Sequence, residues 1–286
     1  MAGFFLAMLK AMSKFDWKKI DAAVRVAPGA TAALQGRDPA GEGLFADKDE
    51  AKERLKVCAK EIDALQDRLY AEHKRALLVV LQGIDTSGKD GTVRGVFNAC
   101  GPLGVDVHAF GRPTELELDH DYLWRVHAAT PRKGTIGIFN RSHYEDVLVA
   151  RVRKLAPAAA IERRYEQINA FEKHLTENGV TILKFMLHIS KDEQKKRLEG
   201  RLADSAKQWK FNPGDLDDRK LWGEFERAYE IVLERCSTEH APWRVIPSDK
   251  KWRRNAIIAA IVQGTLEEMN LQYPKPEWKP GDFTIT

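Results

Sequence analysis

The stretch Gly83-Ile84-Asp85-Thr86-Ser87-Gly88-Lys89 decides the fold. It satisfies the pattern GxxxxGK, in which glycines let the backbone curl until its N–H groups point inward. An apolar run with β-branched residues precedes it at 76–82, and an apolar stripe of helical spacing follows it at 89–100. This order of strand, loop and helix predicts a phosphate-binding loop, in which the lysine and the positive end of the helix attract an anion. The alternative is a glycine-rich turn whose acidic residue caps a helix.

Strand-like and helix-like segments alternate on both sides of this loop. A long amphipathic helix is expected at 47–70. Short apolar runs rich in β-branched residues predict buried parallel strands at 105–110, 135–140, 180–189 and 244–247. The alternation predicts a three-layer α/β fold with a central parallel sheet and right-handed crossovers.

The regions outside this alternating part are less regular. A Gly/Pro/Ala-rich passage at 27–43 is typical of a surface loop, so an N-terminal arm and loop are expected to cover 1–46. The main domain is expected at 47–272, followed by an extended, proline-containing tail at 273–286. The apolar start at 1–9 lacks a basic region and a small-residue cleavage site. It is interpreted as a packing or oligomer contact rather than a secretory signal.

The composition is that of a soluble globular protein. Of 286 residues, 43% are hydrophobic and 31% charged, and the net charge of +4 hints only weakly at a polyanionic partner. No stretch approaches the roughly 20 apolar residues that span a bilayer. The cysteines, Cys58, Cys100 and Cys236, contain no CxxC pair that would indicate zinc or a redox centre. We therefore expect a cytoplasmic protein that binds neither membranes nor nucleic acid.

Two carboxylates distinguish this loop from the common pattern. Asp90 replaces the Ser or Thr that usually follows the lysine and helps to hold Mg²⁺. Asp85 lies inside the loop, where a carboxylate would repel bare phosphate unless a cation lay between them. Asp85 is therefore the first predicted ligand of Mg²⁺, for which Mn²⁺ could substitute. The loop residues predicted to bind phosphate are Gly83, Thr86, Ser87, Gly88, Lys89, Asp90 and Gly91.

A second group of polar residues, NRSHYED at 140–146, follows the third predicted strand. Ligands of open parallel sheets gather beyond the carboxyl ends of the strands. Arg141 can pair with phosphate, while Glu145 and Asp146 can face a metal, its waters or a nucleotide. Alternatively, the first polar residues of the group cap a helix and the acids favour its first turn.

A basic segment follows the fourth predicted strand. Ser190 and Glu193 form a capping-box pair that opens a helix, on which Arg197 and Arg201 share a polar face. An Asn-Pro-Gly sequence interrupts the pattern before the next helix. The arrangement suits a mobile basic lid at about 194–222, and a solvated helix face would show the same pattern.

Five stretches of the sequence resemble the polyphosphate kinase 2 family, over about 47–271. They are GIDTSGKDGTV at 83–93, GRPTELELDHDYLWR at 111–125, IFNRSHYEDVLVARV at 138–152, KQWKFNPGDLDDRKLW at 207–222 and APWRVIPSDKKWRRN at 241–255. The stretch FNRSHYEDV is most similar to the subgroup called class III, which is associated with phosphorylation of nucleoside mono- and diphosphates. The resemblance implies a P-loop kinase fold with a helical basic lid and an N-terminal helical extension.

The resemblance also implies roles for individual residues. The catalytic set that it implies is Asp85, Lys89, Arg141 and Glu145. Family members tend to carry an aspartate at the position of Asn140, so the second metal ligand stays open, with Asp146 as the candidate. The donor chain is expected at the lid residues Arg197, Arg201, Lys207 and Lys210. The nucleotide is expected at Arg141, Glu145 and the strand-end pair Arg112 and Pro113.

The predicted reaction is Mg²⁺-dependent transfer of the terminal phosphate of inorganic polyphosphate to AMP and ADP, giving ADP and ATP, and it is reversible. The resemblance also implies an assembly of identical chains. An ATP-dependent nucleoside monophosphate kinase would share the loop, the arginines and the lid, and a nucleotide-sensing protein without turnover is a further alternative.

Several aromatic and basic residues outside these motifs allow two interpretations. Trp124 and Trp222 are interpreted as core residues rather than base-stacking ones. Lys250, Trp252 and Arg253, after the last strand, can approach the donor or simply form a charged helix N-terminus.

Overall fold

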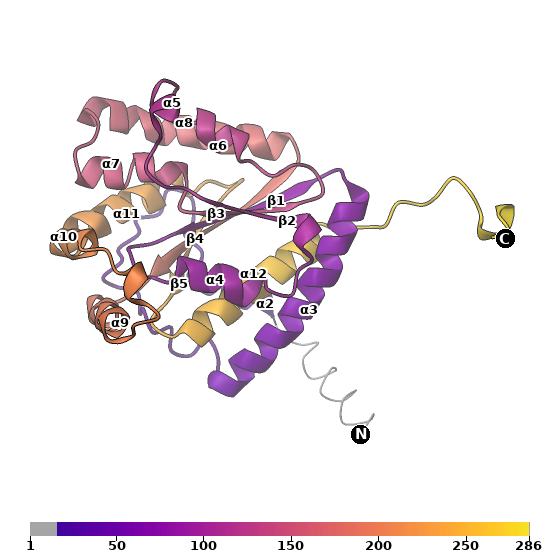
Figure 1. Cartoon of the computed structure of the whole chain (residues 1–286), viewed down its shortest axis with the longest axis horizontal. Coiled ribbons are helices and arrows are strands. Elements are labelled where there is room, and N and C mark those ends of the chain that lie inside the picture. Colours follow the sequence, from indigo (N-terminus) through magenta and orange to yellow (C-terminus); the bar gives the residue numbers. More distant parts are fainter. Residues whose placement is uncertain (1–15, 286) are drawn as a thin grey trace.

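The computed structural model describes residues 16–285 and contains a five-stranded sheet between two layers of helices (Figure 1). All strand pairs are parallel, and the strands lie in the order β2-β3-β1-β4-β5. The strands are β1 (Ala76–Gln82), β2 (Val105–Ala109), β3 (Ile136–Asn140), β4 (Val180–His188) and β5 (Trp243–Pro247). The predicted three-layer α/β fold is confirmed, and each strand boundary lies within one residue of the predicted one.

Helices fill the connections between the strands. The described α-helices are α2 (Trp17–Val24), α3 (Lys48–Glu72), α4 (Lys89–Val96), α5 (Glu115–Leu118), α6 (Trp124–Ala128), α7 (Val149–Val152), α8 (Ala158–Glu177), α9 (Lys191–Ala203), α10 (Gly214–Lys220), α11 (Trp222–Cys236) and α12 (Lys251–Glu268). The described 3-10 helices are η1 (Pro102–Gly104), η2 (His143–Asp146), η3 (Gln208–Lys210) and η4 (Pro280–Asp282). The helix predicted at 89–100 is shorter than expected and ends at Val96, since Phe97 leaves the helical conformation (φ −108°, ψ 7°); a Gly-Pro pair that could not continue a helix follows at 101–102. None of the described helices has the length and apolar composition needed to cross a membrane.

Successive residues of the central strand are buried against different helical layers. Leu78 and Val80 of β1 lie in a core cluster with residues of α8 and α11. Leu77, Val79 and Leu81 lie in a second cluster with residues of α3, α4 and α12. Because side chains of a strand alternate between the two faces of the sheet, a strand covered on both faces is apolar throughout.

The first described helix covers an edge of the sheet. Trp17 of α2 packs so closely on Gly264 of α12 that a Cβ on this glycine would come within 2.2 Å of the indole. Buried Asp21 bonds to Arg244 of the edge strand β5 and to Arg25, at 2.6 Å in the second case. The predicted N-terminal helical extension is therefore present in the described part of the chain, while the apolar start at 1–9 lies outside the described residues.

The chain after α12 runs away from the body as an irregular tail (Figure 1). Tyr273, Trp278 and Phe283 of this tail are each more than half exposed.

β1 and β3 are neighbours in the sheet, and the helices that follow them lie on opposite faces of it. The loops after these two strands therefore lie side by side. The helix α4, which follows β1, packs in the cluster with α12, whereas α8, which follows β3, packs in the other cluster. Open α/β sheets bind ligands in the crevice at such a point. The fold therefore brings the phosphate loop and the segment after β3 next to each other.

Candidate active site

The phosphate loop has a backbone that depends on its glycines. Gly83 (φ 157°) and Gly88 (φ 110°) both lie in the region that favours glycine. A Cβ on Gly83 would lie 2.6 Å from Ser87 Oγ, and a Cβ on Gly88 would lie 1.8 Å from Nη1 of Arg254. The loop reverses between these residues, and α4 begins directly at Lys89. The predicted strand, loop and helix are thus all present.

Lys89 is the first residue of α4, and its buried side chain folds back over the loop. Its Nζ donates to the carbonyl oxygen of Gly83 at 2.7 Å. Burial and nearby Arg141 lower the pKa of Lys89 to about 8, against the opposing effect of Asp85 and Glu145. A phosphate group bound here would favour the charged ammonium, because an anion close to a lysine stabilises its protonated form.

Arg141 joins the two predicted groups of site residues. It follows β3 with a left-handed backbone (φ 63°), and its backbone N–H donates to Leu81 of β1 at 3.0 Å. Its guanidinium donates to Asp85 Oδ1 at 2.5 Å and to Glu145 Oε2 at 3.2 Å. Gln82 fixes the other oxygen of Glu145 at 3.0 Å. The loops after β1 and β3 therefore converge, as the strand-end argument predicts.

Asn140 and Asp90 form a second contact between these loops. The Nδ2 of Asn140 donates to Asp90 Oδ1 at 2.8 Å. Asp90 thus accepts a hydrogen bond in the first turn of α4, where the helix N-terminus also favours a negative charge. An aspartate at position 140 could not donate in this way while ionised.

Asp146 has different surroundings from the other predicted acids. Its Oδ1 lies 3.6 Å from Arg164, and its side chain lines neither of the two cavities next to the loop. Burial raises the pKa of Asp146, although Arg164 opposes this. Its assignment as a metal ligand stays a prediction, and this geometry does not favour it.

Asp85 is the acid that best fits a divalent cation. Its carboxylate lines both cavities, and its side chain is 20% exposed. Among residues 16–285, no group of three or more His, Cys, Asp or Glu side chains is gathered to hold a metal. Mg²⁺ typically uses one or two carboxylates together with water and substrate phosphates, so a single loop aspartate suits it.

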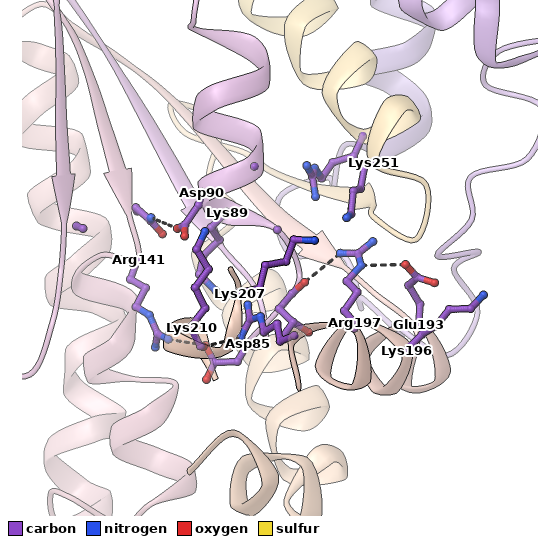
Figure 2. A pocket seen from close by; sticks show the side chains of 18 of the residues that line it. Asp85, Lys89, Asp90, Arg141, Glu193, Lys196, Arg197, Lys207, Lys210 and Lys251 are labelled. Atoms are coloured by element: carbon purple, nitrogen blue, oxygen red, sulfur yellow. Dashed lines mark hydrogen bonds and ion pairs between the residues drawn. The ribbon is translucent and has the colours of Figure 1, made fainter. Parts of the chain in front are cut away.

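A cavity of about 640 Å³ opens in front of the loop, between the sheet and α9 (Figure 2). Its lining has nine Lys or Arg residues and three acidic ones, counted among the described residues. The basic residues are Lys89, Arg141, Lys196, Arg197, Arg201, Lys207, Lys210, Lys251 and Arg254. The acidic residues are Asp85, Asp90 and Glu193. The cavity is therefore suited to a substrate with several negative charges.

Arg197 is held firmly by the backbone around the loop. Its Nη1 donates to the carbonyl oxygens of Thr86 and Ser87 at 3.0 Å each, and its Nη2 donates to that of Ser248 at 2.6 Å. From the other side, Arg254 of α12 donates to the same Ser87 oxygen at 3.1 Å. Burial and the charge of Arg197 lower the pKa of Arg254 to about 9. The predicted basic face at Arg197 is thus not a solvated one.

Two other predicted lid cations, Arg201 and Lys207, form ion pairs within the lid, while Lys210 lies over the ring of Trp209 at 4.9 Å. Arg201 donates to Asp215 Oδ2 and to the carbonyl oxygen of Lys210, both at 3.2 Å. Lys207 lies 2.5 Å from Asp204. Burial and the charge of Asp85 raise the pKa of Asp215 to about 6. The capping box is only half formed, since Ser190 accepts from the Glu193 N–H while the Glu193 side chain pairs with Arg197.

Arg112 and Pro113 are exposed after β2 and line neither cavity, so their role at the acceptor stays a prediction.

Trp222 is buried as expected. The core interpretation of Trp124 is wrong, because this residue is 41% exposed and stacks on His120 at 4.2 Å. Its neighbour Val126 takes the buried position at this point of α6, and the indole of Trp124 lies on the outer side of the helix.

Sequence reasoning missed three cavity cations, Lys196, Lys251 and Arg254. At the start of α12 it pointed instead to the neighbours of the last two, Lys250, Trp252 and Arg253. Of these, Arg253 donates to the carbonyl oxygen of Ala40, and Lys250 does not line the cavity. The available signal was the i, i+3 spacing of Lys251 and Arg254, which puts both residues on one helix face just after a strand end.

The fold and the site define a phosphotransferase of the P-loop kind, with a phosphate loop, a strand-end arginine and a basic lid around one cavity. The sequence model of the family described as Polyphosphate kinase 2 matches residues 45–274. The chain belongs to the polyphosphate kinase 2 family, and it is an enzyme of the polyphosphate phosphotransferase type. The family predicted from the motifs is therefore confirmed.

Individual relatives agree with this assignment. The chain is 51% identical to an AMP/ADP-polyphosphate phosphotransferase of Meiothermus ruber, over 88% of this chain and 95% of that protein. It is 37% identical to an ADP-polyphosphate phosphotransferase of Rhodopseudomonas palustris, over 81% and 84% of the two chains. Its fold matches the crystal structure of polyphosphate kinase 2 from Arthrobacter aurescens TC1 with a TM-score of 0.88 at 42% identity, over 92% of this chain and 94% of that one.

Proposed function

We propose that this protein transfers the terminal phosphate of inorganic polyphosphate to AMP and to ADP, with Mg²⁺ or Mn²⁺ as the metal, and that the transfer is reversible. The observation that carries this proposal is the excess of cations over acids in the cavity, nine against three among the described residues. A polyphosphate chain is a long polyanion, and a row of cations neutralises it along its length. The relative that is 51% identical is named for both AMP and ADP, which supports both acceptors and a class III assignment.

The distribution of charge in the cavity supports an orientation for the two substrates. Figure 2 shows Asp90 and Arg141 on one side, and Lys251, Arg197 and Lys196 on the other. The side with Asp90 and Arg141, which has fewer cations, is also where β2 and β3 end, since Ala109 and Asn140 line the cavity there. The acceptor therefore lies near β2 and β3 in our proposal, and the donor chain extends along α9 and the first turn of α12.

The residues have the following roles in this proposal. Asp85 would hold the metal, which would supply positive charge to neutralise the phosphate oxygens. Lys89 and Arg141 stabilise the negative charge on the transferred group, whose transition state spreads charge over three oxygens. Glu145 orients Arg141 toward the acceptor. The side chains of the lid, with Arg197, Arg201, Lys207 and Lys210 among them, hold the donor.

No covalent intermediate and no strong general base are needed. The acceptor phosphate is already ionised at neutral pH, so it can attack in line once the two substrates are aligned. Catalysis then rests on alignment and on preorganised charge, which is what the paired and buried side chains of this site provide.

The test is to give the purified protein ADP, Mg²⁺ and polyphosphate without ATP, and in parallel AMP in place of ADP. We expect ATP from the first mixture and ADP from the second, measured by chromatography of the nucleotides. ATP offered with AMP in the absence of polyphosphate is the control for a conventional monophosphate kinase. Phosphorylation in this control only, with no product from polyphosphate, would refute the proposal.

Two further parts of the proposal concern the protein in the cell. We propose that it acts in the cytoplasm and as an assembly of identical chains. Cys58, Cys100 and Cys236 are all free thiols, which suits a reducing compartment. Light scattering of the purified chain would measure the mass of the assembly.

A further inference from the structure

A lysine lies fully buried in the middle of the sheet. Lys184 belongs to β4 and lies in register with Val80 of β1 and Trp243 of β5. Its Nζ donates to Glu172 Oε2 at 2.5 Å, to the Cys236 carbonyl oxygen at 2.7 Å and to the Tyr144 hydroxyl at 2.8 Å. All three donors of the ammonium group therefore have partners.

Glu172 of α8 is the centre of this buried network. Besides Lys184, its carboxylate accepts from the Tyr144 hydroxyl at 2.8 Å, and its Oε1 lies 3.2 Å from Nε2 of His143. Glu172, Lys184, Tyr144 and His143 are all fully buried. Burial raises the pKa of Glu172, but Lys184 and His143 outweigh this, so its pKa lies below the ordinary value. The carboxylate is thus ionised opposite the ammonium group.

Stability alone does not explain this network. Moving two charges from water into a protein interior has a large desolvation cost, and well-packed apolar side chains often stabilise a core as well or better. The surrounding positions of the same core cluster are filled by apolar residues such as Val80, Ile168 and Trp243. We therefore ask which segment of the chain the network holds in place.

That segment is η2, which carries site residues on its other side. His143 and Tyr144 are fully buried in the core, whereas Arg141 and Glu145 remain partly exposed, and Arg141 pairs with both Glu145 and Asp85. Arg141 also has a left-handed backbone, a conformation that costs a non-glycine residue energy and persists only where its surroundings impose it. The buried network therefore lies on one side of this short segment, and the ion pair of Arg141 with Glu145 lies on the other.

We propose that Lys184, Glu172 and Tyr144 form a positioning network that sets Arg141 and Glu145 for phosphoryl transfer. These three residues touch no substrate in this proposal and act only through η2. The inference rests on the proposed function, since it assigns the network to the alignment of that reaction. A misplacement of reacting groups by about 1 Å can slow an enzyme by about 100-fold, so a small shift of η2 is enough to matter.

The first test compares Tyr144→Phe with Tyr165→Phe. Both changes remove one hydroxyl from a fully buried tyrosine of the same core cluster. The hydroxyl of Tyr165 has no hydrogen-bond partner among the described residues, so this variant is the matched control. We expect kcat to fall by about 10- to 100-fold in Tyr144→Phe, with KM for polyphosphate changed less than about twofold, and both parameters to stay at wild type in Tyr165→Phe. Equal kcat values in the two variants would overturn the proposal.

The second test removes both charges with the double variant Lys184→Met, Glu172→Leu. Thermal unfolding checks that it folds, and a folded variant with the kcat of wild type would overturn the proposal. Hydrogen exchange of the Arg141 and Glu145 amides is measured in Tyr144→Phe as well, because it reports the position of η2 without any assay of activity. Faster exchange than in wild type supports the network, and unchanged exchange overturns it. An inactive wild-type protein would instead refute the proposed function, and the exchange data would still decide on the network.

Discussion

Lys251 offers a sharp test of where the donor chain lies. It lines the cavity from the first turn of α12, and its neighbour Lys250 does not. Burial and the nearby charges of Arg197 and Arg254 lower the pKa of Lys251. Its ammonium therefore lies among several cations, with Glu193 as the opposing charge, and a distal phosphate of the donor would be attracted to this region. We predict that Lys251→Ala weakens binding of long polyphosphate, whereas Lys250→Ala does not.

The magnitude follows from the exposure of Lys251. Two unit charges about 4 Å apart attract each other by about 1 kcal/mol in bulk water and by about 4 kcal/mol near a protein surface. Because Lys251 is an exposed residue at the rim of the cavity, and only partly desolvated, the lower part of this range applies. Since 1.4 kcal/mol corresponds to a factor of ten, KM for long polyphosphate should rise by roughly five- to tenfold in Lys251→Ala.

The assay is initial-rate kinetics with ADP at saturation and with donors of different length. A long chain reaches both the loop and α12, so it loses the contact with Lys251. A short donor such as tripolyphosphate occupies the loop end and should show a change in KM below about twofold. Raising the salt concentration should reduce the difference between the variants for the long donor, because salt screens exposed charges. An equal rise of KM for both donor lengths, or an equal effect of Lys250→Ala, would refute this placement of the donor.

Three other changes test the loop and the lid. Asp85→Asn removes the proposed metal ligand, so it should lower kcat by about 100-fold or more without changing the melting temperature. An unchanged Mg²⁺ dependence of the residual activity would contradict that role. Gly88→Ala places a side chain on a left-handed backbone and against Arg254. It should lower the free energy of unfolding by at least about 1 kcal/mol, as measured by urea denaturation. An unchanged free energy of unfolding would contradict the loop geometry. Asp215 has a pKa raised from 3.8 to about 6, so the stability that its protonation contributes is lost as the pH rises through 6. Below that pH its charge no longer pairs with Arg201, and KM for polyphosphate should fall a few-fold between pH 7.5 and 5.5 in wild type but stay flat in Asp215→Asn; identical pH profiles would count against the pairing.

The fold was predictable because four of its strands are largely buried; the prediction of a buried strand at 105–110 is wrong, since β2 lies at the edge of the sheet and is mostly exposed. Buried strands consist of short uninterrupted apolar runs, and the loop at 83–89 fixes which of them is central. The meeting of Asp85, Arg141 and Glu145 was predictable for a similar reason, since parallel strands present their carboxyl ends at one edge. These features depend on local sequence and on the rules of parallel sheets alone.

The missed features depend on tertiary placement. Lys251 and Arg254 belong to the site because α12 crosses behind the loop at one particular rotation, which spacing within the helix does not determine. Lys184 lies within a run of apolar residues, and only the folded chain brings Glu172 and Tyr144 to it. The prediction that Trp124 is a core residue was wrong because the sequence around an aromatic residue does not show whether another helix or strand covers it.

The hydrogen bonds of Arg197 to the phosphate loop restrict which part of the lid we expect to move. An outward rotation of all of α9 would break its bonds to Thr86, Ser87 and Ser248 at once. The far end of the lid is anchored as well, since Arg219 donates to the Lys191 carbonyl oxygen at 2.6 Å and to Gln194 at 2.9 Å. The contacts of Arg201, in contrast, stay inside the segment 201–215 and travel with it. We therefore expect any movement of the lid to be confined to the stretch between Arg197 and Arg219, because a larger movement would break the contacts of both residues.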